Sequence, residues 1–80
     1  MAHAGKIKVA LVGVSGALAK RFLPEIFYSQ VLKLVAVCDI DGDQLKRTCE
    51  AYMVNGYRTY DDLLENEEID FAIISIKKAV

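Results

Sequence analysis

Two glycines near the start of the sequence have a spacing that suggests chemistry. Gly13 ends an apolar, β-branched run, and Gly16 begins a segment with helical periodicity. A phosphate bound at such a turn needs a backbone with few side chains, N–H groups directed at it and the positive end of a helix dipole. The residue types at 13–18 therefore predict a turn that holds the pyrophosphate of a dinucleotide. Its members are Gly13, Val14, Ser15, Gly16, Ala17 and Leu18.

An acidic residue further along the chain fits the same interpretation. The usual fingerprint is G-x-G-x-x-G/A between a strand and a helix, with an acid about 20 residues on. Ser15 and Leu18 depart from this pattern, but Asp39 lies 20 residues beyond Ala19, at the end of the second strand-like run. A carboxylate there can accept hydrogen bonds from the adenosine ribose. The alternative is that Gly13 and Gly16 only permit a sharp turn and Asp39 only begins a loop.

The cofactor expected from these residues is NAD rather than NADP. The carboxylate of Asp39 would repel a 2′-phosphate, and the first cation after it is Lys46, seven residues on. No metal site is expected, because Cys38 and Cys49 are too few and too far apart and His3 stands alone in the N-terminal tail.

The elements that position these residues alternate along the chain. Apolar runs predict strands at 7–13, 31–39, 57–60 and 69–76. Helices are expected from about Gly16, from a capping box at Asp41 to about Met53, where Asn55 and Gly56 end it, and over 62–65 with Asp61 as the cap. Connections too long for hairpins predict an α/β fold with a Rossmann-like parallel sheet, β-α-β-α-β-α-β, in the strand order 3-2-1-4.

Composition excludes several classes of protein. The chain is 54% hydrophobic with a formal net charge of −1, so it lacks the basic surface of a nucleic-acid-binding protein. No apolar run reaches the roughly 18 residues of a membrane span, and the start has no secretory signal, so a soluble, cytoplasmic protein is expected.

The end of the chain suggests an incomplete fold. The run 69–76 is apolar on both faces and no helix follows to cover it. We therefore expect residues 1–80 to form one partial dinucleotide-binding domain without a C-terminal substrate domain. The exposed sheet edge would pair with the remainder of a parent enzyme or with a second copy of the chain.

Three further features carry a resemblance to a known family. The first helix contains Leu23-Pro24, the second strand ends in Cys38-Asp39, and the element YDDLL at 60–64 precedes EIDFAII at 68–74. Together they resemble the N-terminal half-domain of the glucose-fructose oxidoreductase, inositol dehydrogenase and MocA (Gfo/Idh/MocA) family of NAD(P)-dependent sugar and polyol oxidoreductases. The likeness extends from Lys6 to Ile76.

The resemblance implies hydride transfer between a sugar or polyol carbon and the nicotinamide. Ser75 and Ile76, at the carboxyl end of the fourth strand, would border the cofactor cleft. The chain departs from the family where Ile76-Lys77 replaces Thr-Pro or Pro-Pro, and the family's Glu-Lys-Pro motif and Asp/His pair do not occur in it. Catalytic residues are therefore not expected within the chain. Two alternatives are a non-catalytic nucleotide-binding or interaction module, and a structural fragment without a ligand.

Overall fold

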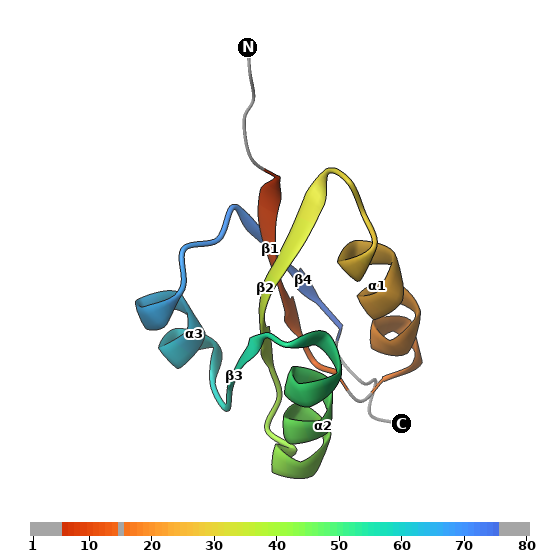
Figure 1. Cartoon of the computed structure of the whole chain (residues 1–80). Coiled ribbons are helices and arrows are strands. Elements are labelled where there is room, and N and C mark those ends of the chain that lie inside the picture. Colours follow the sequence, from red (N-terminus) through yellow and green to blue (C-terminus); the bar gives the residue numbers. More distant parts are fainter. Residues whose placement is uncertain (1–5, 15, 76–80) are drawn as a thin grey trace.

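The computed structural model describes residues 6–14 and 16–75 and contains one four-stranded parallel sheet. Its order is β3-β2-β1-β4, which confirms the predicted topology. The strands are β1 (Ile7–Val12), β2 (Leu32–Cys38), β3 (Asn55–Tyr57) and β4 (Phe71–Ile74), and the helices are α1 (Ala17–Phe27), α2 (Gly42–Tyr52) and α3 (Tyr60–Asn66). Helices α1 and α2 cover one face of the sheet, and α3 covers the other (Figure 1).

Strand β1 lies at the centre of the sheet, and its alternating side chains enter two separate cores. Val9 and Leu11 pack beneath α1 and α2, whereas Ala10 packs with Leu63 of α3. All four of these side chains are fully buried. Because each large apolar side chain taken out of water stabilises the fold by about 1.5–3 kcal/mol, both faces of β1 hold it in place.

The end of α2 differs from the sequence prediction. Met53 ends the helix in the left-handed conformation, with φ 55°, and Asn55 and Gly56 belong to strand β3 instead of capping the helix. Packing explains the position of the glycine: a Cβ on Gly56 would overlap the Sγ atom of Cys49 in α2. The third strand therefore begins two residues earlier than predicted and ends at Tyr57.

Helix α3 also begins earlier than predicted. Thr59, and not Asp61, is its N-cap, and the Oγ1 atom of Thr59 accepts a hydrogen bond of 3.1 Å from the N–H of Asp62. A hydroxyl in extended backbone can reach the third residue after it, so Thr59 was the better cap. Asp61 and Asp62 instead occupy the first turn, where carboxylates favour the helix dipole.

Strand β4 is shorter than the predicted run 69–76 and lies at the edge of the sheet. Within the described residues it pairs only with β1, and Phe71 and Ile74 are 43% and 56% exposed.

No helix in the described part of the chain is long and apolar enough to cross a membrane.

Candidate functional site

The turn that follows β1 is held between the ends of the two neighbouring strands (Figure 1). The N–H of Gly13 donates to the carbonyl of Cys38 at 2.7 Å, and the N–H of Ser75 donates to the carbonyl of Val12 at 2.7 Å. The structure thus brings Gly13, Asp39 and Ser75 to one cavity at the carboxyl edge of the sheet. Two other predicted site residues, Ser15 and Ile76, lie outside the described residues.

Both the backbone conformation and the packing at position 13 require a glycine. Its φ is +89°, a conformation that residues with a side chain rarely adopt. A Cβ on Gly13 would also overlap the carbonyl oxygen of Ser75. The turn therefore needs glycine here to let β4 pack beside β1, independently of any ligand.

The backbone donors at the start of α1 have no partner among the described side chains. Gly16 is its N-cap, the first turn holds no acidic residue, and no described side chain accepts a hydrogen bond from the N–H groups of residues 17–19. A Cβ on Gly16 would have only the Oγ atom of Ser75 within 4 Å, at 3.5 Å. A helix start that the described side chains leave uncompensated can bind an anion.

Leu18 does not occupy the close-packing place that the fingerprint assigned to it. Its side chain is 57% exposed, whereas the neighbouring Ala19 is fully buried in the core beneath α1. Ala19 is thus the small residue that lets α1 pack closely on the sheet. The apolar side chain of Leu18 stands in solvent beside the turn.

Asp39 joins the turn to the start of α2. Its Oδ2 atom accepts a hydrogen bond of 2.8 Å from the N–H of Val14, and its Oδ1 atom accepts one of 2.9 Å from the N–H of Asp41. Asp39 is 8% exposed and lines the cavity. In Rossmann folds, a carboxylate that follows the second strand accepts hydrogen bonds from the ribose of a dinucleotide.

The cavity beside Asp39 measures about 450 Å³ and lies where the strands end. Sequence reasoning missed four of its residues, which come from the segments after β2 and β3: Ile40, Arg58, Thr59 and Tyr60. Ile40 is 80% exposed there, although it is a large apolar residue. The signal that could have found them is topological, because the residues following each parallel strand meet at the same edge.

Cys38 also lines this cavity, but its thiol is not activated as a nucleophile or as a metal ligand. Burial raises the pKa of its thiol, and the negative charges of Asp39 and Asp62 raise it further. The thiol therefore stays protonated at neutral pH, in the form that is a poor nucleophile and a poor metal ligand. Within the described ranges, no three His, Cys, Asp or Glu side chains are grouped to hold a metal ion.

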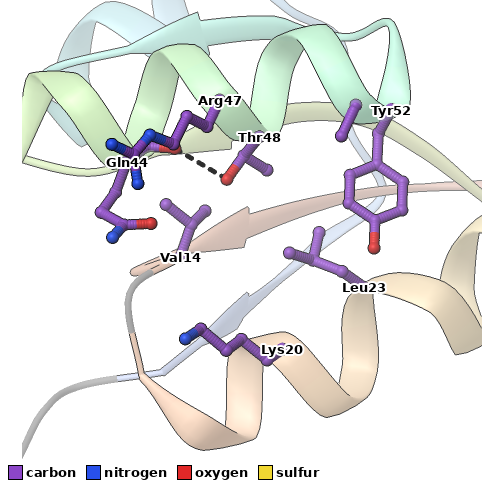
Figure 2. Close-up of a pocket in the computed structure, with 8 residues that line it drawn as sticks. Val14, Lys20, Leu23, Gln44, Arg47, Thr48 and Tyr52 are labelled. Atoms are coloured by element: carbon purple, nitrogen blue, oxygen red, sulfur yellow. Dashed lines mark hydrogen bonds between the residues drawn. The ribbon is translucent and has the colours of Figure 1, made fainter.

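A second cavity, of about 240 Å³, lies between α1 and α2. Figure 2 shows Lys20 of α1 with Gln44 and Arg47 of α2 at the end near Val14. The hydroxyl of Thr48 is used within its own helix, where it donates to the carbonyl of Gln44 at 2.8 Å. This groove offers long cationic side chains and few fixed donors, so the carboxyl edge is the better candidate site.

Comparison with known proteins gives a family match over almost the whole chain. Residues 7–79 match the Gfo/Idh/MocA family model, which is described as an oxidoreductase family with an NAD-binding Rossmann fold. No curated protein matches the chain.

Several solved structures share the fold. Myo-inositol 2-dehydrogenase from Lactobacillus plantarum is 30% identical over 90% of this chain and 22% of its own, with a TM-score of 0.80. The WlbA dehydrogenase from Chromobacterium violaceum, solved with NADH and UDP-GlcNAcA, is 30% identical over 91% of this chain and 21% of its own, with a TM-score of 0.83. Scyllo-inositol dehydrogenase from Lactobacillus casei, solved with NAD(H) and scyllo-inositol, is 26% identical over 90% and 22%, with a TM-score of 0.80. The chain thus spans about a fifth of the length of these proteins.

Proposed function

The chain belongs to the Gfo/Idh/MocA oxidoreductase family of NAD-binding Rossmann folds, and from this premise we propose that its carboxyl edge binds the adenosine and pyrophosphate of NAD. The turn at residues 13–18 holds the pyrophosphate through the N–H groups at the start of α1, since those of Gly13 and Val14 already bond within the fold. Asp39 accepts hydrogen bonds from the adenosine ribose. Ser75 and Ile76 border the cleft on the side toward the nicotinamide. NAD is the preferred cofactor because a 2′-phosphate would approach the carboxylate of Asp39.

The observation that carries this proposal is the open start of α1. The N–H groups of residues 17–19 have no acceptor among the described side chains, and no acid in the first turn offsets the helix dipole. That dipole places about half a positive charge at the helix end. A pyrophosphate there would satisfy the donors and neutralise the charge together.

The cavity supports the adenosine half of the proposal. Its volume of about 450 Å³ is adjacent to Asp39 and includes the exposed side chain of Ile40. An apolar side chain beside a carboxylate suits an adenosine, which presents a flat base next to ribose hydroxyls. Ile40 would lose exposed apolar surface against the base while Asp39 holds the sugar.

The proposed reaction belongs to a larger enzyme. When bound, the nicotinamide of NAD accepts or returns a hydride, and the chain's own residues bind and orient the cofactor. A sugar or polyol is proposed as the substrate, supported by the two inositol dehydrogenases among the relatives. Cys38 stays protonated and Asp39 is engaged by backbone donors. We therefore propose that the 80-residue chain binds cofactor without turning substrate over.

The edge strand β4 is proposed as the place where the chain meets the remainder of that enzyme or a second copy. Phe71 and Ile74 leave apolar surface exposed along it. Exposed apolar strand edges favour pairing with another strand. Sedimentation velocity of the chain is expected to show association that increases with concentration, and a monomer at every concentration would contradict this part.

A single substitution tests the pyrophosphate site. Gly16→Asp would give α1 the kind of cap that α2 already has, because Gly16 has extended backbone with φ −84° and room for a Cβ. The new carboxylate would accept from the helix N–H groups and repel a phosphate. NADH fluorescence and calorimetric titration with NAD are expected to show at least tenfold weaker binding, with the unfolding free energy unchanged or raised.

Gln30→Asp is the matched control. It adds the same charge at an exposed position between α1 and β2, near the amino ends of the strands and away from the proposed site. We expect this variant to bind NAD within about twofold of the parent chain. Equal affinity of Gly16→Asp and the parent chain would contradict the proposal.

A further inference from the structure

We propose that Arg58 determines how strongly the chain discriminates between NAD and NADP. Its guanidinium stands at the adenosine cavity and opposes the repulsion that Asp39 exerts on a 2′-phosphate. The inference rests on the proposed function, since it concerns the adenosine half of the same site.

The position of Arg58 follows from the end of β3. The strand ends at Tyr57, so the next residue emerges at the carboxyl edge beside the segment that follows β2. The Nη1 atom of Arg58 lies 3.2 Å from the place that a Cβ on Gly42 would occupy. The guanidinium therefore rests against the first residue of α2, and Arg58 lines the same cavity as Asp39.

The two neighbouring acids have much of their charge met by backbone donors. Asp39 accepts from two N–H groups, and the Oδ1 atom of Asp41 accepts from the N–H groups of Asp43 and Gln44 at 3.1 and 3.2 Å. Arg58, in contrast, makes no hydrogen bond or ion pair with another described side chain. Its guanidinium thus has donors available for a ligand.

The segment that carries Arg58 is fixed on both sides. The hydroxyl of Tyr57 donates to Glu67 at 2.6 Å, and the hydroxyl of Thr59 caps α3. The backbone of Arg58 is thus held between two anchored residues, and only its side chain needs to adjust to a ligand. Holding the backbone in place reduces the entropy lost on binding.

Arginine and phosphate are well matched in charge and shape. A guanidinium presents a planar set of donors that can bind a phosphate through two hydrogen bonds. In Rossmann sites an acid after the second strand favours NAD, whereas a nearby arginine accommodates the 2′-phosphate of NADP. This cavity contains both kinds of residue. The preference for NAD is therefore smaller than Asp39 alone would produce.

The test compares ligands that differ only at the ribose. Calorimetric titrations of the whole chain would use 5′-AMP against adenosine 2′,5′-bisphosphate, and NAD against NADP. For Arg58→Gln we expect 5′-AMP and NAD to bind within about twofold of the parent chain. The two ligands with a 2′-phosphate are expected to bind at least tenfold more weakly. Arg58→Lys, which keeps the charge without the planar donors, should fall between.

Arg21→Gln is the matched control, because Arg21 is exposed on α1 and lines neither cavity. It should leave all four affinities within about twofold. Equal losses for both members of each pair in Arg58→Gln, or no loss for any, would overturn the role of Arg58. Failure of the parent chain to bind either NAD or 5′-AMP would reject the proposed function itself, and the inference with it.

Discussion

Helices α1 and α2 leave neighbouring strands at the same edge of the sheet, yet their starts differ. The Asp41 carboxylate caps α2 by accepting from the N–H groups of Asp43 and Gln44, and Asp43 adds a negative charge in the first turn. Helix α1, whose N-cap is Gly16, has no side-chain cap among the described residues and no acid in its first turn. Among the described residues, a side chain accepts from two N–H groups at the start of α2 and from none at the start of α1.

The third helix follows the pattern of the second. Thr59 caps α3, and Asp61 and Asp62 occupy its first turn. Glycine is itself a favourable N-cap and costs only about a few tenths of a kcal/mol relative to a capping side chain, so the Gly16 cap of α1 loses little stability.

Asp39 links the two contrasting regions. It accepts from Val14 in the turn before α1 and from Asp41 at the start of α2. The capping box predicted for α2 is altered accordingly, because the N–H of Asp41 bonds to Asp39 and not to the side chain of Gln44. A ligand that reaches Asp39 therefore touches a residue that positions both helix starts.

The largest effect on stability is expected from Gly13→Ala, in the turn that precedes α1. The substitution forces a side chain into φ +89° and against the carbonyl of Ser75. Backbone strain and overpacking each cost about 1–3 kcal/mol, so urea denaturation should show a loss of about 3 kcal/mol. Gly16→Ala is the control and should cost no more than about 1 kcal/mol, because its Cβ meets only an ordinary contact. Equal losses would show that the turn is not held as described.

A smaller effect on stability is expected when the side-chain cap of α2 is removed. Asp41→Ala removes the acceptor for two N–H groups and should lower the unfolding free energy by about 1 kcal/mol. Affinity for NAD should stay within about threefold, since the pyrophosphate is assigned to the other helix. If Asp41→Ala weakened NAD binding as much as Gly16→Asp, the contrast between the two helix starts would be wrong.

The smallest effect on stability concerns Tyr57, at the end of β3, and appears only at high pH. The hydrogen bond to Glu67, with burial and the Glu67 charge, raises the pKa of Tyr57 from 10 to about 12. The folded state then holds a proton that the unfolded state releases, so this contribution to stability is complete below pH 10 and is lost as the pH rises toward 12.

Tyr57→Phe tests this contribution. The difference in thermal midpoint between the parent chain and Tyr57→Phe should shrink between pH 10 and pH 12. A difference that stays constant for Tyr57→Phe across this range would mean that the bond to Glu67 does not stabilise the fold.

The parts of the fold that the sequence predicted well are those set by long patterns. The buried strand runs of β1 and β2, the cap at Asp41 and the alternation of elements gave the sheet order correctly. The short elements were misplaced, because β3 is three residues long and is defined by pairing and by the packing of Gly56 against α2. Local propensity carries little information about such a strand.

The candidate site was predictable only in part, for a similar reason. The fingerprint located the turn and Asp39 because both lie within one strand-helix-strand unit. Arg58 was missed because only the six residues after Asp39 were considered as sources of a cation. Arg58 lies 19 residues further along the chain, and the end of β3 brings it to the same cavity. The double role of Asp39 was also hidden, since backbone donors to its carboxylate depend on the folded turn.

The most direct test of the open helix start is an NMR titration of the ¹⁵N-labelled chain with NAD. We predict the largest amide shifts at residues 17–19 and at Ile40, with small shifts at Asp43 and Gln44, whose N–H groups already bond to Asp41. No saturable shifts, or the largest shifts at Thr48 and Ala51 in the groove between α1 and α2, would contradict the account.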